Sequence, residues 1–230
     1  MKNLTKKIAI LAISFMSFVG IQSASAVEGV SVGLGLNTAG FMGSGKEVMT
    51  GSGAATTQED ITEEDGAFSA DVASAFIEYS MNDQVSFGIE MFVEDVTTPE
   101  NLNLQKSSGE TGETGGVRNT VKATFKDHTT LYANINMPFN TYIKLGYIMV
   151  DVATQESLGT GSAYNDVDTT GYTVGLGYQY QADNGVFARL EVSVAEYDNI
   201  TAASTADSSK EITVSDMYGA VGSFKIGKSF

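Results

Sequence analysis

The single histidine of this chain, His128, is the first place to look for catalytic chemistry. It follows Asp127 and precedes Thr129 and Thr130, so a carboxylate, an imidazole and two hydroxyls occupy consecutive positions. Nucleophilic catalysis needs a hydroxyl, a base that activates it and a third group that orients the base. No third group is evident here, and Thr130 stands where a serine would be expected. The residues therefore predict a protein that is not an enzyme.

Motifs that bind cofactors are also missing from the sequence. It contains no Gly-x-Ser-x-Gly motif, no His or Cys set at metal-ligand spacing and no phosphate-binding loop. We expect no cofactor. The net charge of −15 argues against nucleic acid as a partner, because nucleic-acid binding requires a basic surface.

The densest group of acidic residues, in the segment DITEEDG, consists of Asp60, Glu63, Glu64 and Asp65. Clustered carboxylate oxygens can bind Ca²⁺ or Mg²⁺. The spacing of these four residues matches no EF-hand loop, so a hydrated acidic loop is the favoured interpretation. Divalent cations at the loops are the alternative.

The first 26 residues have the pattern of a signal peptide. Three lysines precede an apolar run over residues 8–21, and Ala-Ser-Ala at 24–26 supplies a cleavage motif. The run of 14 residues is shorter than the roughly 20 that cross a bilayer as a helix. We predict export, a mature chain that begins at Val27, and one domain over residues 27–230 that contains no disulfide because the chain has no Cys.

Alternation of apolar and polar residues runs through the rest of the chain and predicts β-strands. It is clearest over residues 30–37, 85–94, 172–180 and 188–194. It is less regular over residues 68–80, 117–136, 141–152 and 212–230, with Asp127 out of phase in the second of these segments. The sequence therefore predicts eight strands, each with one apolar and one polar face.

The links between these strands alternate between long and short. The long links cover residues 43–67, 95–116, 153–168 and 198–211, and the short ones cover 81–84, 137–140 and 181–185. This rhythm is typical of membrane barrels with long external loops and short periplasmic turns. We predict an all-β fold: a transmembrane antiparallel up-and-down β-barrel of eight strands.

The polar face of the predicted strands repeatedly carries glycine, which would weaken a strand that faced water. A narrow eight-stranded barrel has a crowded interior in which glycine fits. Tyrosines near the strand ends lie on the apolar face, as expected at the two surfaces of a membrane. We therefore expect the apolar face to contact lipid; a soluble barrel with that face inward is the alternative. The glycines are at 33, 35, 88, 146, 175 and 177, and the tyrosines at 79, 147, 172, 178 and 180.

Charged residues of both signs occupy the same alternate strand positions as these glycines, so we expect them to point inward. A buried charge must be paired or reach water, so we predict a cross-strand network of ion pairs that fills the lumen. A narrow or gated path for ions is the alternative. The residues are Glu78, Glu90, Glu94, Lys122, Lys126, Lys144, Arg189, Glu191 and Lys225.

Two segments near the C-terminus resemble a known family. Residues 171–200, GYTVGLGYQYQADNGVFARLEVSVAEYDNI, resemble the penultimate hairpin of small outer-membrane barrels of the OmpA, OmpX and Ail type. The terminal SFKIGKSF, ending in Phe230, is similar to the assembly signal of that family, although Lys228 departs from its apolar pattern. The resemblance implies export to the outer membrane, contact with its lipid and lipopolysaccharide, and recognition of Phe230 by the barrel-assembly machinery.

The function predicted from these observations is that of a non-enzymatic outer-membrane barrel. It would have a structural role in the envelope, present acidic loops outward, and have a lumen plugged by ion pairs. The alternatives are a small porin or channel for ions and small solutes, an adhesin that acts through its loops, and a lipid A-modifying enzyme that uses His128.

Overall fold

The computed structural model describes residues 29–50, 59–105, 117–158, 163–205 and 210–230. The predicted signal peptide and the mature N-terminus at Val27 lie outside the described residues. No helix in the described part of the chain is long and apolar enough to cross a membrane. The strands are β1 (Gly29–Thr50), β2 (Glu59–Ser80), β3 (Val85–Phe92), β4 (Val96–Thr97), β5 (Asn101–Gln105), β6 (Val117–Met137), β7 (Thr141–Leu158), β8 (Val167–Gln181), β9 (Val186–Tyr197), β10 (Ile200–Ala203) and β11 (Lys210–Ser229).

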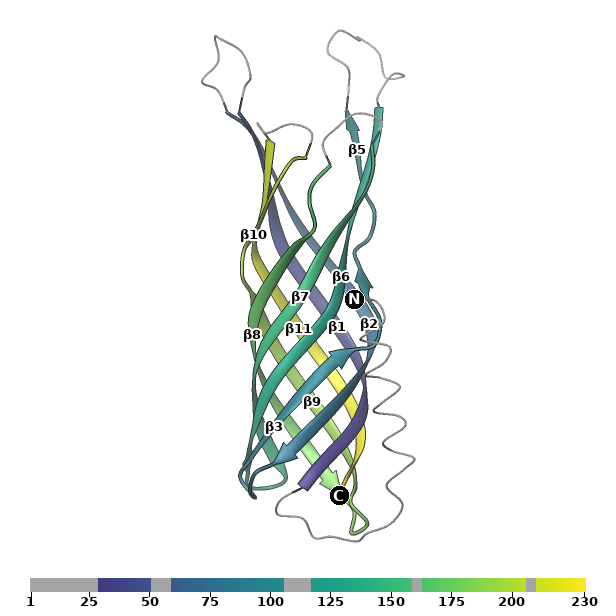
Figure 1. Cartoon of the computed structure of the whole chain (residues 1–230), viewed down its shortest axis with the longest axis vertical. Helices are drawn as coiled ribbons and strands as arrows, with labels where there is room; N and C mark the ends of the chain where they lie inside the picture. Colours follow the sequence, from purple (N-terminus) through teal and green to yellow (C-terminus); the bar gives the residue numbers. More distant parts are fainter. Residues whose placement is uncertain (1–28, 51–58, 106–116, 159–162, 206–209) are drawn as a thin grey trace.

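Eight of these strands form a closed antiparallel ring, which confirms the predicted barrel. Their order is β1-β2-β3-β6-β7-β8-β9-β11, and β11 pairs with β1 to close it. The short strands β4 and β5 pair with β6, and β10 pairs with β11. Each long strand pairs with its neighbours in the chain, so the topology is up-and-down (Figure 1).

Three tight turns and the C-terminus lie at one end of the barrel (Figure 1). The turn between β6 and β7 places Phe139 and Asn140 at positive φ, and the turn between β8 and β9 places Gly185 at a φ of 83°. The Ser229 amide donates to the carbonyl oxygen of Gly185, which ties the last strand to this end. These turns coincide with the three short links predicted from the sequence.

The strands at the opposite end are longer than predicted. β1 and β2 continue into the predicted link 43–67, and β7 continues to Leu158. β4, β5 and β10 lie within the other predicted long links. Where their side chains are described, these extensions carry exposed charged residues such as Glu63 and Asp65 on the outer face, so they lack the apolar-out alternation that marks a lipid-facing strand.

Two β-bulges interrupt the strand pairing in the upper part of the barrel, away from the tight turns. The register shifts between Lys126 and Thr129 of β6, opposite β7, and between Met42 and Ser44 of β1, opposite β11. Asp127 in β6 and Asp216 in β11 adopt φ values of 52° and 50° there. An extra residue in one strand reverses which of its side chains point inward beyond the bulge. Asp127, which breaks the alternation of apolar and polar residues in the sequence, lies at the first of these bulges.

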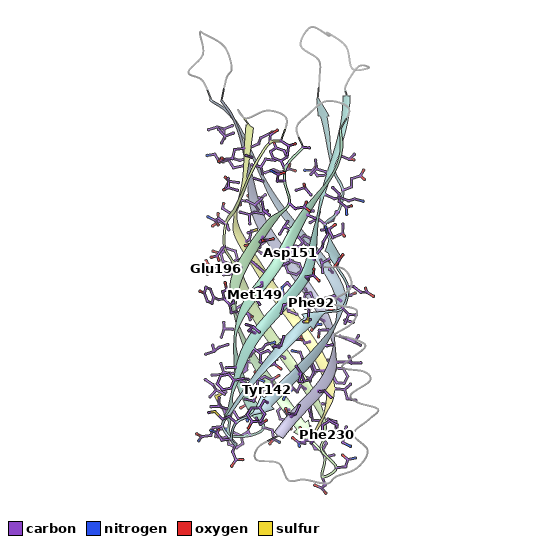
Figure 2. The ribbon with its side chains drawn as sticks, in the orientation of Figure 1. Phe92, Tyr142, Met149, Asp151, Glu196 and Phe230 are labelled. Carbon is purple, nitrogen blue, oxygen red and sulfur yellow. The ribbon has the colours of Figure 1, made fainter. Side chains whose placement is uncertain are left out.

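The outer surface divides into an apolar band and a polar rim. The band carries exposed large apolar side chains on every strand of the ring, among them Leu36, Ile77, Ile89, Leu131, Leu145, Leu176, Val192 and Phe224. Exposed tyrosines lie near both edges of the band: Tyr79, Tyr178 and Tyr180 near the tight turns, and Tyr147, Tyr172 and Tyr218 near the rim. The polar rim comprises Thr38, Asp71, Thr129, Asp151, Thr170 and Glu196. Figure 2 shows Asp151 and Glu196 just above Met149, the last apolar residue of the band on β7. This surface is that of a transmembrane barrel.

Candidate functional site in the barrel interior

One part of the interior is a bidentate ion pair between Glu78 of β2 and Arg189 of β9. The Nη2 and Nη1 atoms of Arg189 lie 2.7 and 2.8 Å from Oε1 and Oε2 of Glu78. Tyr132 and Asn134 of β6 donate to Oε2 of Glu78 at 3.0 and 2.8 Å. The guanidinium of Arg189 also lies 4.6 Å from the ring centroid of Phe187. Hydrogen bonds and ring contacts therefore hold this pair in one geometry across the lumen.

A second cluster is a square of alternating charges from four strands. The Nζ atoms of Lys144 (β7) and Lys225 (β11) lie 2.6 and 2.7 Å from Oε2 of Glu90 (β3). Each also lies 3.1 Å from Oε1 of Glu191 (β9). The Tyr142 hydroxyl donates to Oε2 of Glu191 at 2.8 Å. Each carboxylate thus bridges both ammonium groups.

Together these residues form what we call the charged plug: Glu78, Glu90, Lys144, Arg189, Glu191 and Lys225. All six are buried. Three carboxylates balance three cations, so the plug has no net formal charge. Buried ion pairs of this kind are retained only when their hydrogen bonds are satisfied.

Glycine and aromatic residues alternate around the plug on neighbouring strands. In four directly opposed cross-strand pairs an aromatic ring lies over a glycine, and a Cβ atom on that glycine would overlap the ring. Glycine is required here because the interior has room for one ring and not for a second side chain. The pairs are Gly33 with Phe76, Gly88 with Tyr132, Gly177 with Tyr142, and Gly227 with Phe187.

Three of the nine residues expected in the lumen lie outside the plug. Glu94 is exposed in the break between β3 and β4, where the strand alternation no longer applies. Lys122 and Lys126 lie beyond the bulge at Asp127, which reverses the parity of β6 and turns them to the outer face. The structure thus brings six of the nine together and places these three elsewhere.

Above the plug, the part of the interior beyond the polar rim is lined mainly by apolar side chains. Phe41, Phe68 and Phe125 stack on one another with ring centroids 5.1 to 6.4 Å apart. Phe125 faces inward because of the bulge in β6. With Phe92 and Met217 these rings line a cavity of about 430 Å³, which we call the aromatic cavity. The sequence analysis did not predict this cavity. The one available signal was Phe92, an aromatic residue on the polar face of its strand.

His128 faces this cavity from β6. Its ring stacks on Phe92 with centroids 4.2 Å apart, and its Nε2 atom lies 3.1 Å from the Tyr197 hydroxyl oxygen. Thr130, the hydroxyl considered as a nucleophile, is also buried inside the barrel. The two side chains therefore face the lumen and not the surrounding lipid.

The acidic group considered for metal binding is distributed along β2. Glu63 pairs with Lys46 at 3.3 Å, and Asp65 accepts a hydrogen bond from Ser44 at 2.6 Å. Glu64 accepts from Asn101, whose Nδ2 lies 3.2 Å from its Oε2. Asp60 lies near the start of the same strand. Among the described residues no group of three or more His, Cys, Asp or Glu side chains could hold a metal ion.

The rim contains one pair of opposed carboxylates. Asp151 of β7 lies directly opposite Asp168 of β8, beyond the apolar band. Partial burial, followed by the charges of Asp168 and Asp127, raises the pKa of Asp151 above its ordinary value. Lys126, opposite Asp151 on β6, acts against this shift without cancelling it. Like charges opposite one another in a ladder are destabilising, so the Asp151–Asp168 pair weakens the rim slightly.

Comparisons with known proteins give structural neighbours only. No protein-family model matches the chain, and no curated protein gives a significant match. The outer membrane protease OmpT from Escherichia coli is 10% identical with a TM-score of 0.47, and the match covers 91% of this chain and 100% of that one. Ail, the attachment invasion locus protein of Yersinia pestis, is 9% identical with a TM-score of 0.37 (84% and 98% covered). The outer membrane protein AlkL is 13% identical with a TM-score of 0.40 (92% and 95% covered). The assignment as a barrel rests on the strand pairings described above.

Proposed function

We propose that this protein is a non-enzymatic outer-membrane barrel with a sealed lumen and a structural role in the envelope. The observation that carries the proposal is the charged plug, whose six buried side chains come from β2, β3, β7, β9 and β11 and meet across the lumen. The apolar outer band with its tyrosines supports insertion in the membrane. Glu63 and Asp65 of β2 are exposed beyond the rim and would face the medium.

A sealed lumen predicts a barrel that does not conduct ions. An ion entering the membrane-embedded part would have to separate Glu90 and Glu191 from Lys144 and Lys225, and each separation exposes a buried charge. The plug therefore disfavours the alternative of a small porin.

Planar-bilayer recording tests the proposal. Purified protein whose folding is verified by its shift on SDS gels before and after boiling should give no conductance steps above the protein-free bilayer. A Glu90→Ser/Lys144→Ser double variant provides the positive control, because it opens space in the plug while removing one charge of each sign. Steps in the wild-type protein would overturn the sealed-lumen proposal.

The envelope role is tested separately in a deletion strain. Increased sensitivity to detergent, restored by the wild-type gene, is expected if the barrel stabilises the envelope. Complementation by a Thr130→Ala variant, which removes the hydroxyl considered as a nucleophile, should be equally effective, because the proposal assigns no catalytic role to this residue. Failure of the Thr130→Ala gene alone, with the gel shift on boiling intact, would contradict a non-enzymatic function.

A further inference from the structure

The aromatic cavity has the size and lining of a binding site for a small apolar molecule. Its volume of about 430 Å³ is roughly three times that of a dry apolar cavity that holds benzene. Val96 and Val152 add to the phenylalanine rings that line it. A sealed structural barrel needs a plug but does not need an unfilled space above it. Filling the cavity would recover dispersion contacts that its lining now lacks.

The wall beside the cavity has a seam where two strands are not paired. β2 pairs with β3 from Ser74 to Ser80, and the last backbone bond on this side joins the Val93 amide to the Ala73 carbonyl. Beyond it β4 and β5 pair with β6, and no ladder joins them to β2 in the described part of the chain. Figure 1 shows β3 ending part of the way up the barrel while β2 and β6 continue.

The cavity reaches this seam. Its lining includes Glu64 and Ala67 of β2 and Pro99 and Asn101 from the opposite side, and a ligand entering here would separate the exposed hydrogen bond that Asn101 donates to Glu64 across the seam. The seam begins at the level of Val93, where the outer face changes from the apolar band to the polar rim. A molecule at the surface of the membrane would therefore meet the opening directly.

One buried polar atom of a residue that lines the cavity has no hydrogen-bond partner. His128 is 8% exposed, and its Nδ1 atom is buried without a hydrogen bond, while Nε2 faces Tyr197. An unsatisfied buried nitrogen is costly, so a ligand that supplies one hydrogen-bonding group here would gain affinity.

We propose that the aromatic cavity binds one small amphiphile, an apolar body with a single hydrogen-bonding group, which enters through the seam between β2 and β4–β5. The phenylalanine rings hold the apolar body and Nδ1 of His128 pairs with the polar group. The charged plug closes the site on the periplasmic side. The ligand can come from the membrane, as a chain with a polar end, or from the medium, as a dissolved compound of the same chemistry.

The first test uses 1-aminoanthracene, which combines fused aromatic rings with one amine, and protein in phosphatidylcholine nanodiscs. Wild-type protein should give saturable fluorescence enhancement with one site per chain. Ala123→Trp, which fills the cavity from β6, should weaken binding at least about tenfold. The matched control is Ala133→Trp, on the lipid-facing side of the same strand, which should bind as the wild type does. A linear response equal to that of empty nanodiscs, or equal binding by the two tryptophan variants, would refute the site.

His128→Phe tests the polar contact without emptying the cavity. It should weaken binding of 1-aminoanthracene by about tenfold and leave binding of anthracene unchanged, because only the first ligand carries a group that pairs with Nδ1. An equal loss for both ligands would overturn the assigned role of His128. The gel shift on boiling verifies folding of each variant.

Displacement of the probe identifies the source of the ligand. Dodecan-1-ol and lysophosphatidylcholine are each titrated against bound 1-aminoanthracene. Displacement by both supports a site open to dissolved amphiphiles, and displacement by the lysolipid alone supports a site for a membrane chain. Displacement by neither would contradict the proposal. Because none of these measurements depends on conductance, the binding site can fail while the sealed lumen stands.

Discussion

The lower and upper parts of this barrel have opposite polarity. In the membrane-embedded part Leu145 and Val192 face outward, and Lys144 and Glu191 face inward. Beyond the rim the arrangement is reversed, since acids such as Glu63 face water and the phenylalanine rings line the interior. The first arrangement is that of a membrane protein and the second that of a soluble barrel. The same strands thus adapt to two solvents along their length.

The strands make this change in two ways. In β7 the apolar residues move from odd to even positions, from Leu145 and Tyr147 outside to Ile148, Val150 and Val152 inside. In β6 and β11 a bulge reverses the parity instead, which turns Phe125 inward. The comparison shows that the outer part has a folded apolar core of its own and is not a set of loops.

The largest expected effect comes from breaking the plug in the lower part. Glu90→Leu removes one of the two carboxylates that Lys144 and Lys225 share and should destabilise the barrel by about 3–5 kcal/mol, because Glu191 alone is left to balance two buried ammonium groups. The loss is measured in detergent as the urea concentration at which half of the protein no longer shows the gel shift on boiling. Glu196→Leu, at the rim, is the control and should change the midpoint little. Equal midpoints for the two variants would show that the plug does not stabilise the fold.

A smaller loss is expected from overpacking the lower interior. Gly177→Val forces a side chain into the ring of Tyr142 and should cost about 1–3 kcal/mol in the same assay. Gly222→Val provides the matched control, because nothing lies within 4 Å of a Cβ atom at Gly222. If both variants unfold at the wild-type midpoint, the glycine and aromatic layer is less tightly packed than the structure indicates.

A substitution at the β6 bulge tests the upper part of the barrel by itself. Asp127→Val places a β-branched residue at positive φ and should weaken the outer half by about 1–2 kcal/mol, whereas Asp127→Gly should not. Limited proteolysis of protein in nanodiscs should cut the valine variant faster in the residues beyond the rim. The gel shift on boiling should persist, because the plug is untouched. Loss of that shift would mean that the two parts do not fold independently.

The smallest effect is expected at the rim. Asp168→Asn removes the charge opposite Asp151 and should stabilise the protein at pH 7 by a few tenths of a kcal/mol. The raised pKa of Asp151 means that its charged form disfavours the folded state. The contribution of Asp151 to wild-type stability should therefore rise slightly as the pH falls through this pKa, and the variant should show less of this rise. Thermal midpoints between pH 7 and pH 4 measure the difference, and an identical pH dependence would argue against repulsion between the two carboxylates.

The candidate site was only partly accessible from the sequence. Glu78, Glu90, Lys144, Arg189, Glu191 and Lys225 could be assigned to the interior because they share the parity of the glycines in regular strands. Lys122 and Lys126 were misassigned because one extra residue at Asp127 inverts that parity. A bulge depends on the register with the neighbouring strand, which alternation within one strand does not contain.

By itself the sequence determined the eight-stranded ring and its apolar outer face, because every residue of a membrane strand faces either lipid or the lumen and the alternation records that choice. Only the tertiary structure decided which charges meet, since Glu90 and Lys225 are brought within 2.7 Å by closure of the ring across 135 positions of sequence. In the described residues β4 and β5 pair with β6 and form no ladder with β2, and the aromatic cavity reaches the seam between them. Both features depend on contacts between strands far apart in the chain.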